Sequence, residues 1–227
     1  MSDSIEHYLG LIYIQEAASM IAVEALKPQT GEVVWDMAAA PGSKTTQIAA
    51  EMKNTGCILA NDVDRRRLNT LRFNLNKSGV CNCIVNQADA TKLRCNMSFD
   101  RILVDAPCSN SGQIRQGYSE EAFTKGEVKR KSVIQRKLID AAEKHLKAGG
   151  VLVYSTCSLT VEENEAIADY AVKKHGFSVE KIKSKINAHE GILQHRGEVF
   201  SDDVADSLRV YPQDNGADGF FAAKMRR

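Results

Sequence analysis

Short apolar runs alternate with amphipathic stretches along most of this chain. The apolar runs have the length of buried strands and cover residues 32–37, 57–62, 81–86, 99–105 and 151–155. The stretches between and after them carry helical patterns and cover residues 44–52, 65–78, 132–147 and 161–175. In the stretch 65–78, Leu68, Leu71 and Leu75 share one helix face. The helix 132–147 is expected to stop at Gly149 and Gly150, since glycines commonly end helices.

This alternation predicts the fold class. Strands that alternate with helices form βαβ units, and these build a mostly parallel sheet with helices on both faces. We therefore predict a Rossmann-like α/β fold, whose ligands bind at the carboxyl ends of the strands. Residues 1–30 are expected to form a helical lead-in packed on the core. Residues 31–227 are expected to form a single domain that ends in a strand at 219–224.

Composition and charge exclude several classes of protein. The chain has 227 residues and a net charge of +1, and no apolar run approaches the roughly 20 residues that span a bilayer. The N-terminus lacks the pattern of a signal peptide, so a cytoplasmic location without membrane contact is expected. The six cysteines form no CxxC pair, so neither a disulfide framework nor a metal site is expected. One basic group offers modest support for a phosphate partner: Lys125, Lys129, Arg130, Lys131, Arg136 and Lys137.

Small residues join the first strand to its helix in the segment 36–47, DMAAAPGSKTTQ. Ala39, Ala40, Pro41 and Gly42 let the backbone approach a ligand, and the helix that follows offers free N–H donors at its N-terminus. The segment matches neither GxGxxG nor the phosphate loop GxxxxGK[ST]. A tight turn without a ligand is the alternative interpretation of this segment alone.

Acidic residues follow the next two strands. Asp62 lies roughly 20 residues beyond the small-residue turn, where such side chains hydrogen-bond ribose hydroxyls. Asp89 follows the third strand and is a candidate to hold an adenine amino group. Together with the turn, these positions predict an adenosine-containing ligand. S-adenosylmethionine fits better than a dinucleotide because the chain shows no second nucleotide-binding half.

Two cysteines follow the fourth and fifth strands, in DAPCS (105–109) and STCS (155–158). Cys108 and Cys157 are therefore expected at the same sheet edge as the cofactor. A thiolate is a strong nucleophile, and a polar setting at a strand end can lower the thiol pKa from about 8.5. For either cysteine alone, an inert buried thiol is the alternative.

The motifs DMAAAPGSKTTQ, NDVD, QADA, FDRILVDAPCS, AGGVLVYSTCSLTVEENE and RVYPQDNGADGFF, in this order, resemble those of the Sun-type (Nop2/Sun) RNA 5-methylcytosine methyltransferases. YIQEAASM at 13–20 resembles the segment that precedes them. The resemblance covers nearly the whole chain, and the paired PCS and TCS motifs are specific to this family. It implies a class I S-adenosylmethionine-dependent methyltransferase fold with a seven-stranded sheet, and a catalytic domain over 31–227. The chain is similar to short, archaeal-like members without an appended RNA-binding domain.

The resemblance also implies a mechanism. Cys157 would attack carbon 6 of a cytosine, so that carbon 5 can take the methyl group. Asp105 would hold the protonated N3 of the base, and Cys108 would assist loss of the carbon-5 proton and release of the enzyme. Lys44 would lie near both cofactor and base, although a solvated lysine in a first helical turn is the alternative.

By the same resemblance, a defined set of residues binds the cofactor: Ala39, Ala40, Pro41, Gly42, Ser43 and Lys44 at the methionine end, Asp62 at the ribose, Asp89 at the adenine, and Arg67 and Asp105 in the same pocket. For RNA contact, the candidates are Lys125, Lys129, Arg130, Lys131 and Arg136. A transfer RNA is expected before a ribosomal RNA, and a monomer before an oligomer. A separate partner protein that supplies RNA-binding surface is a further possibility.

The chain departs from the family pattern at two positions. Family members often carry Cys where this chain has Ala38, and Gly where it has Asn110. The change at Asn110 is expected to affect the loop 111–117.

Three alternatives remain open from the sequence. A DNA cytosine methyltransferase would use the cysteine of the PC motif, and it would need a large target-recognition region for which the chain has no room. A catalytically silent RNA-binding protein of the same fold has no chemical reason to keep Lys44, Asp105, Cys108 and Cys157 together. A thiol redox protein needs two cysteines whose Cα atoms lie within about 7 Å.

Overall fold

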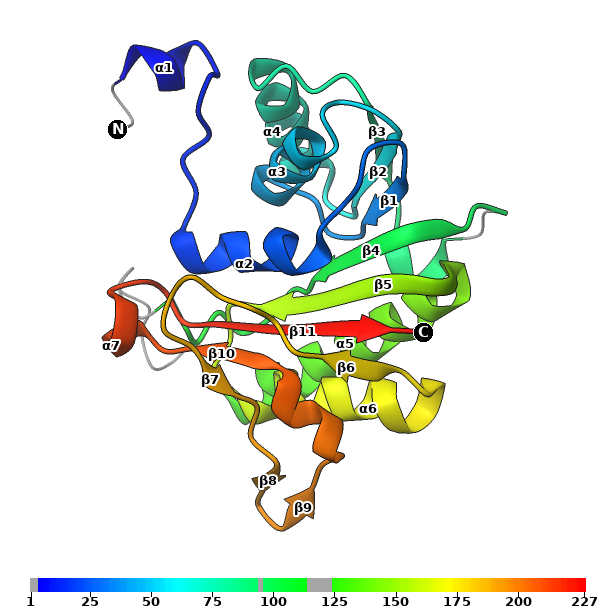
Figure 1. Ribbon diagram of the computed structural model, residues 1–227, viewed down its shortest axis with the longest axis vertical. Coiled ribbons are helices and arrows are strands. Elements are labelled where there is room, and N and C mark those ends of the chain that lie inside the picture. Colours follow the sequence, from blue (N-terminus) through cyan, green and yellow to red (C-terminus); the bar gives the residue numbers. More distant parts are fainter. Residues whose placement is uncertain (1–3, 94–95, 114–123) are drawn as a thin grey trace.

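A mixed sheet forms the centre of the protein (Figure 1). The computed structural model describes residues 4–93, 96–113 and 124–227. Five mutually parallel strands lie in the order β3-β2-β1-β4-β5. Their bounds are Val33–Asp36 (β1), Cys57–Asp62 (β2), Cys83–Gln87 (β3), Phe99–Asp105 (β4) and Leu146–Thr156 (β5).

Antiparallel strands extend the sheet beyond β5. One edge of β11 pairs with β5. The other edge of β11 pairs with β10 along its first half and with β6 along its second half. β7 pairs with the free edge of β10. The bounds are Ser178–Glu180 (β6), His189–Glu190 (β7), Leu208–Val210 (β10) and Phe220–Arg226 (β11). The hairpin of β8 (Gln194–His195) and β9 (Glu198–Val199) is separate.

The predicted α/β class with a mostly parallel core is confirmed, but the predicted number of strands is wrong. The described residues form a sheet of nine strands. Six of these, β1 to β5 and β11, correspond to the runs predicted as strands. The remaining β6, β7 and β10 are three, two and three residues long, which is too short to leave an apolar pattern in the sequence.

Helices cover both faces of this sheet. Their bounds are Ile5–Tyr8 (α1), Ala17–Leu26 (α2), Ser43–Glu51 (α3), Arg65–Lys77 (α4), Lys125–His145 (α5), Glu165–His175 (α6) and Pro212–Asn215 (α7). Side chains of α2 and α3 share one apolar cluster with Val34, Leu103 and Val153 of the sheet. Side chains of α5 and α6 share another with Trp35 and Tyr154, which point to the opposite face. Residues next to each other in a strand thus enter different cores, as strand geometry requires.

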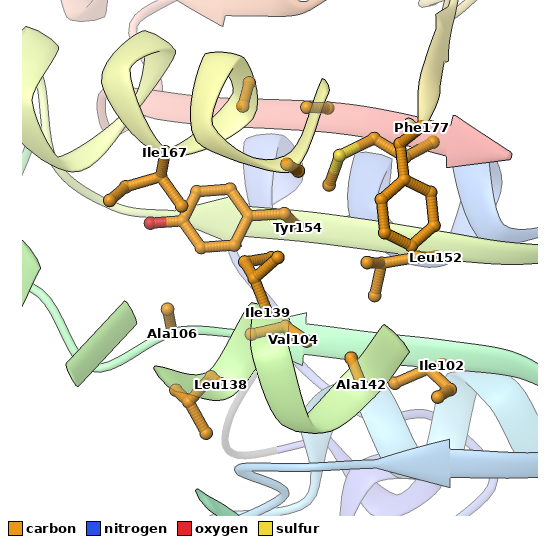
Figure 2. Packing of buried hydrophobic residues seen from close by; sticks show 14 of the residues in the cluster. Ile102, Val104, Ala106, Leu138, Ile139, Ala142, Leu152, Tyr154, Ile167 and Phe177 are labelled. Atoms are coloured by element: carbon orange, nitrogen blue, oxygen red, sulfur yellow. The ribbon is translucent and has the colours of Figure 1, made fainter. Parts of the chain in front are cut away.

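The core beneath α5 and α6 is a close-packed layer. Figure 2 shows Ile139 of α5 and Ile167 of α6 beside the Tyr154 ring of β5, and Leu152 of the same strand beside Phe177. The Tyr154 hydroxyl lies in this apolar layer and donates a 2.5 Å hydrogen bond to the Glu163 carbonyl. This bond ties strand β5 to the turn that precedes α6.

The helix predicted over 132–147 differs from the observed one. α5 begins at Lys125 and ends at His145, and β5 begins at the next residue. Leu146 is already extended and pairs with Phe99, so pairing with β4 replaces the last predicted helical turn. Gly149, with φ of 75°, and Gly150 lie inside β5, where the pairing register with β4 shifts. The glycines therefore mark an irregularity in the strand, not a helix end.

The helix predicted over 161–175 is divided in two. A 3-10 turn covers Val161–Glu163, and α6 begins at Glu165. Between them, Asn164 leaves helical geometry, and its side chain bonds to Thr156 at the end of β5 and to Ser158 in the loop that follows. Side-chain bonding of this kind competes with helix continuation. The third strand also begins later than predicted, at Cys83.

The N-terminal segment joins the core through α2. Six of its ten residues are buried, and Ala18, Ile21 and Leu26 belong to the cluster on the α3 face of the sheet. The short helix α1, by contrast, buries no residue. No helix among the described residues combines the length and the apolar content that crossing a membrane requires.

We predict that Leu26→Ala lowers the free energy of unfolding by about 2–5 kcal/mol, because it opens a cavity under a fully buried side chain. Leu11→Ala is the matched control, since Leu11 is 72% exposed, and its effect should stay within about 0.5 kcal/mol. Urea unfolding of the three proteins measures both values. Equal losses in the two variants would contradict the packing of α2 on the core.

Candidate active site

A cavity of about 820 Å³ opens at the carboxyl ends of the parallel strands. Small-molecule sites usually have roughly 300–1,000 Å³. Most of the predicted site residues line it: Ala40, Pro41, Ser43, Lys44, Asp62, Arg67, Asp89, Asp105, Cys108 and Cys157. Ala39 is buried in the loop that forms one wall, and its N–H donates to the Asn61 carbonyl at 2.8 Å. Gly42 caps α3 in the same loop.

The loop between β1 and α3 needs its small residues. Gly42 has φ of 111°, and a Cβ there would lie 2.9 Å from Leu71 Cδ1 of α4. Any larger residue would therefore strain the backbone at this positive φ and displace the Leu71 side chain. Helix α3 begins at Ser43 without a side-chain cap, and its positive N-terminal end favours an anionic group such as a carboxylate.

Asp62 holds this loop in place from the end of β2. Its Oδ2 accepts a hydrogen bond from the Ala40 N–H at 3.1 Å, and its Oδ1 accepts one from the Asp64 N–H at 2.9 Å. Arg67 lies 3.5 Å from the same carboxylate and donates to the Ala40 carbonyl. A carboxylate has further lone pairs, so Asp62 can still accept a hydroxyl from a ligand in the cavity.

Asp89 caps the 3-10 turn Ala90–Lys92 after β3. Its Oδ1 accepts from the Thr91 N–H at 3.0 Å and from the Thr91 hydroxyl at 2.7 Å. The hydrogen bond from the Thr91 side chain, with Lys92 nearby, holds the pKa of Asp89 below its ordinary value. Asp89 thus lines the cavity as a carboxylate fixed by its own turn.

Lys44 and Asp105 form an ion pair inside the cavity. Lys44 Nζ lies 2.8 Å from Asp105 Oδ2 and donates to the Ser19 hydroxyl of α2 at 2.7 Å. The other Asp105 oxygen accepts from the Ser155 hydroxyl at 2.8 Å. Lys44 is 8% exposed, so it is not the solvated lysine of the alternative interpretation. These contacts fix both charged groups before any ligand binds.

The two cysteines of the PCS and TCS motifs are neighbours. β4 and β5 pair in parallel with Asp105 opposite Ser155, and the loops that follow place Cys108 Sγ 3.3 Å from Cys157 Sγ. Both are free thiols. The hydrogen bond to Cys157, together with burial, raises the pKa of Cys108 well above its usual range. Cys108 therefore keeps its proton and can donate it toward the Cys157 sulfur.

Asn110 bonds to both thiols. Its Oδ1 lies 3.3 Å from Cys108 Sγ and 3.0 Å from Cys157 Sγ. Its φ of 58° lies in the left-handed region, where glycine is most favoured and asparagine is among the best tolerated of other residues. This backbone constraint explains why Asn can replace the Gly expected here. Of the loop expected at 111–117, residues 114–117 lie outside the described ranges.

The basic residues of α5 do not form one surface. Lys131 and Lys137 line the cavity together with Ile134 and Leu138. Arg130 instead donates to Glu127, and Arg136 lies over the Tyr170 ring at 5.3 Å. Lys125 and Lys129 are exposed and are not part of the cavity wall. Helical periodicity turns these side chains in different directions, so only Lys131 and Lys137 of this group line the cavity, and RNA contact by the group stays a prediction.

Several lining residues did not appear among the predicted site residues: Glu16, Ser19, Asn61, Thr91, Gln113 and Phe220. Glu16 caps α2 and also accepts from the Asp218 N–H at 3.1 Å, which joins distant parts of the chain. The resemblance of YIQEAASM to a family segment was the available signal for Glu16 and Ser19. Asn61 lies in NDVD and Phe220 in RVYPQDNGADGFF, so the same resemblance was the signal for these two, whereas Thr91 and Gln113 lie outside the quoted motifs.

Comparisons with known proteins agree with this geometry. A family model described as 16S rRNA methyltransferase RsmB/F matches residues 23–226. A tRNA (cytosine(49)-C(5))-methyltransferase from Pyrococcus abyssi is 45% identical over 225 residues, which are 98% of this chain and 72% of that protein. A ribosomal RNA small subunit methyltransferase F from Shewanella piezotolerans is 39% identical over 236 residues. That match covers all of this chain and 48% of the relative, so the chain spans about half of its length.

Solved structures give the same result. NSun6 from Pyrococcus horikoshii with SFG, an analogue of S-adenosylmethionine, has a TM-score of 0.87 at 36% identity. The match covers all of this chain and 56% of that one. TrmN from Thermus thermophilus, at 18% identity and a TM-score of 0.59 over 92% of this chain and 48% of that one, shares the fold. The chain therefore belongs to the RsmB/F (Nop2/Sun) family of S-adenosylmethionine-dependent RNA cytosine-5 methyltransferases.

Proposed function

We propose that Cys157 is the nucleophile with which this chain methylates carbon 5 of a cytosine in RNA, through a covalent adduct at carbon 6. The observation that carries the proposal is the placement of two thiols 3.3 Å apart beside the Lys44–Asp105 ion pair in one cavity. Bound S-adenosylmethionine supplies the electrophilic methyl group. Everything else in the reaction is assigned to side chains of the chain itself.

The cavity walls fit this cofactor. The uncapped N-terminus of α3 suits its carboxylate, and residues 39–44 allow close backbone approach at the methionine end. Asp62 is assigned to the ribose hydroxyls and Asp89 to the adenine amino group, since both carboxylates line the cavity at the ends of successive strands. Arg67 supports the site by holding Asp62 and the Ala40 carbonyl.

The two sulfurs have different roles. Cys108 is buried and retains its proton, so it stabilises negative charge on the adjacent Cys157 sulfur. Attack of the Cys157 thiolate on carbon 6 makes carbon 5 nucleophilic, while Asp105 accepts a hydrogen bond from the protonated N3. After methylation, Cys108 releases its own proton to solvent and, as thiolate, takes the carbon-5 proton. The electron pair of that C–H bond re-forms the double bond between carbons 5 and 6, and Cys157 leaves carbon 6 as a thiolate. A DNA-type mechanism would reverse these roles.

The substrate assigned here is a transfer RNA. The support is the 45% identity to a relative named for cytosine 49 of tRNA, whereas relatives named for ribosomal RNA reach 39%. The target base must leave its stack to reach the cavity. A reduced thiol pair suits a cytoplasmic enzyme. The protein is proposed to act as a monomer, and a separate RNA-binding partner would add to its RNA-contacting surface. Thiol redox activity alone would leave the Lys44–Asp105 pair without a role.

We predict opposite behaviour from two alanine variants. Cys157→Ala should lose methyl transfer to bulk tRNA by at least about a thousandfold, because no other group forms the adduct. Cys108→Ala should accumulate RNA covalently bound to the protein, since proton removal fails after the methyl group is transferred. Radiolabelled methyl incorporation and denaturing gels measure both effects. An active Cys157→Ala variant with an inactive, adduct-free Cys108→Ala variant would assign the nucleophile to Cys108.

We also predict that the double variant Lys131→Gln/Lys137→Gln weakens RNA binding about tenfold or more, with cofactor binding unchanged. These two lysines line the cavity, and each lost phosphate contact should lower the steepness of the salt dependence by roughly one. Lys125→Gln/Lys129→Gln is the matched control, because it removes the same charge from the same helix outside the cavity wall. RNA affinity measured over a salt series gives the result. Equal losses of RNA affinity in the two double variants would show that the charge of the helix matters and that the position of the lysines in the cavity wall does not.

A further inference from the structure

Glu163 is a fully buried carboxylate in the turn Val161–Glu163, between β5 and α6. Within the described residues, its side chain bonds to uncharged donors. Its Oε1 accepts from the Ser109 N–H at 3.0 Å and from Gln135 Nε2 at 3.2 Å. Burying a charge is costly unless several hydrogen bonds compensate for it, and this carboxylate has that compensation.

The second oxygen of Glu163 collects three hydroxyl groups. Oε2 accepts from the Ser109 hydroxyl at 2.5 Å, from the Ser158 hydroxyl at 2.7 Å and from the Thr160 hydroxyl at 2.9 Å. Ser109 directly follows Cys108, and Ser158 directly follows Cys157. One carboxylate therefore holds the residue next to each thiol.

These hydrogen bonds of Glu163 matter because the two cysteine loops lie beyond the end of the sheet, where strand pairing no longer fixes their relative position. The pairing of β4 with β5 ends at Asp105 and Ser155, while the cysteines lie three and two residues further on. Beyond the strands, the relative position of the loops depends on contacts between them. The hydrogen bonds of Glu163 to Ser109 and Ser158 are such contacts, and the link from the Gly112 N–H to the Cys157 carbonyl at 2.9 Å is another.

We propose that Glu163 is a positioning residue that sets the spacing between Cys108 and Cys157. The proposal rests on the roles of the two thiols in the proposed function. Attack on carbon 6 needs Cys157 and the base, whereas proton removal and release need both sulfurs at the same base. Loss of the carboxylate should therefore slow the second half of the reaction more than the first.

Glu163→Gln tests this role with almost no change in shape. A carboxamide has one acceptor oxygen, so it cannot accept from all five donors that the carboxylate serves. We expect kcat to fall roughly 10- to 100-fold, because small displacements of reacting groups lower the rate by about that much. KM for S-adenosylmethionine and for RNA should stay within about twofold of the wild-type values. The fraction of protein covalently bound to RNA during turnover should rise.

Asp169→Asn is the matched control. Asp169 is also a mostly buried carboxylate that accepts from a backbone N–H and a hydroxyl, both of Ser201, at 2.7 and 2.8 Å. It lies on α6, and its bonds do not involve either cysteine loop. A general loss of stability should affect both variants, whereas the change in kcat and in trapped adduct should appear with Glu163→Gln alone.

A second readout measures the geometry without catalysis. Dibromobimane bridges neighbouring thiols, and peptide mass spectrometry identifies the bridged Cys108–Cys157 pair. The bridging rate should fall severalfold in Glu163→Gln and stay at the wild-type rate in Asp169→Asn. If Glu163→Gln does not fold, Ser158→Ala, which removes one of the five donors, should show the same changes at smaller size.

The proposal would be overturned if Glu163→Gln bridged its two thiols at the wild-type rate and lost no more kcat than Asp169→Asn. Slow bridging in Glu163→Gln with no methylation of any RNA by the wild type would leave the spacing role standing, and the proposed function would then be the part that fails.

Discussion

The parallel pairing of β4 with β5 is the constraint on which the site depends. It places Asp105 opposite Ser155, so the two side chains hydrogen-bond and the loops after both strands leave the sheet side by side. Those loops carry Cys108 and Cys157, which lie 49 positions apart in the chain and 3.3 Å apart at their sulfurs. A shift of this pairing by one residue would turn every side chain of one strand to the opposite face and separate the thiols.

The charged side chains near the paired strands β4 and β5 are held in place before any ligand binds. Asp105 is held by Lys44 and Ser155, Asp62 by backbone N–H groups and Arg67, and Glu163 by uncharged donors beneath the cysteine loops. Preorganised charges of this kind need little rearrangement when a reaction begins. The same contacts also stabilise the loops, so folding and chemistry depend here on the same hydrogen bonds.

The sequence predicted the parts of the fold that follow from local patterns. The apolar runs 57–62 and 99–105 match β2 and β4 at both ends, and most of the motif residues after the strands line one cavity. It failed where long-range pairing decides: Leu146 is the first residue of β5 and pairs with Phe99 of β4, although its segment looks helical. Nothing in the local pattern around Glu163 indicates that it joins both cysteine loops, because its partners come from three separate segments.

The identity of the sulfur that attacks the base is the central claim, and one measurement tests it without any substitution in the protein. Wild-type protein, S-adenosylmethionine and tRNA containing 5-fluorocytidine would be incubated, digested and analysed by peptide mass spectrometry. Carbon 5 of that base carries fluorine in place of the proton that must leave, so the adduct persists. The structure predicts the nucleotide on the peptide that contains Cys157. A nucleotide on Cys108 instead would contradict the account.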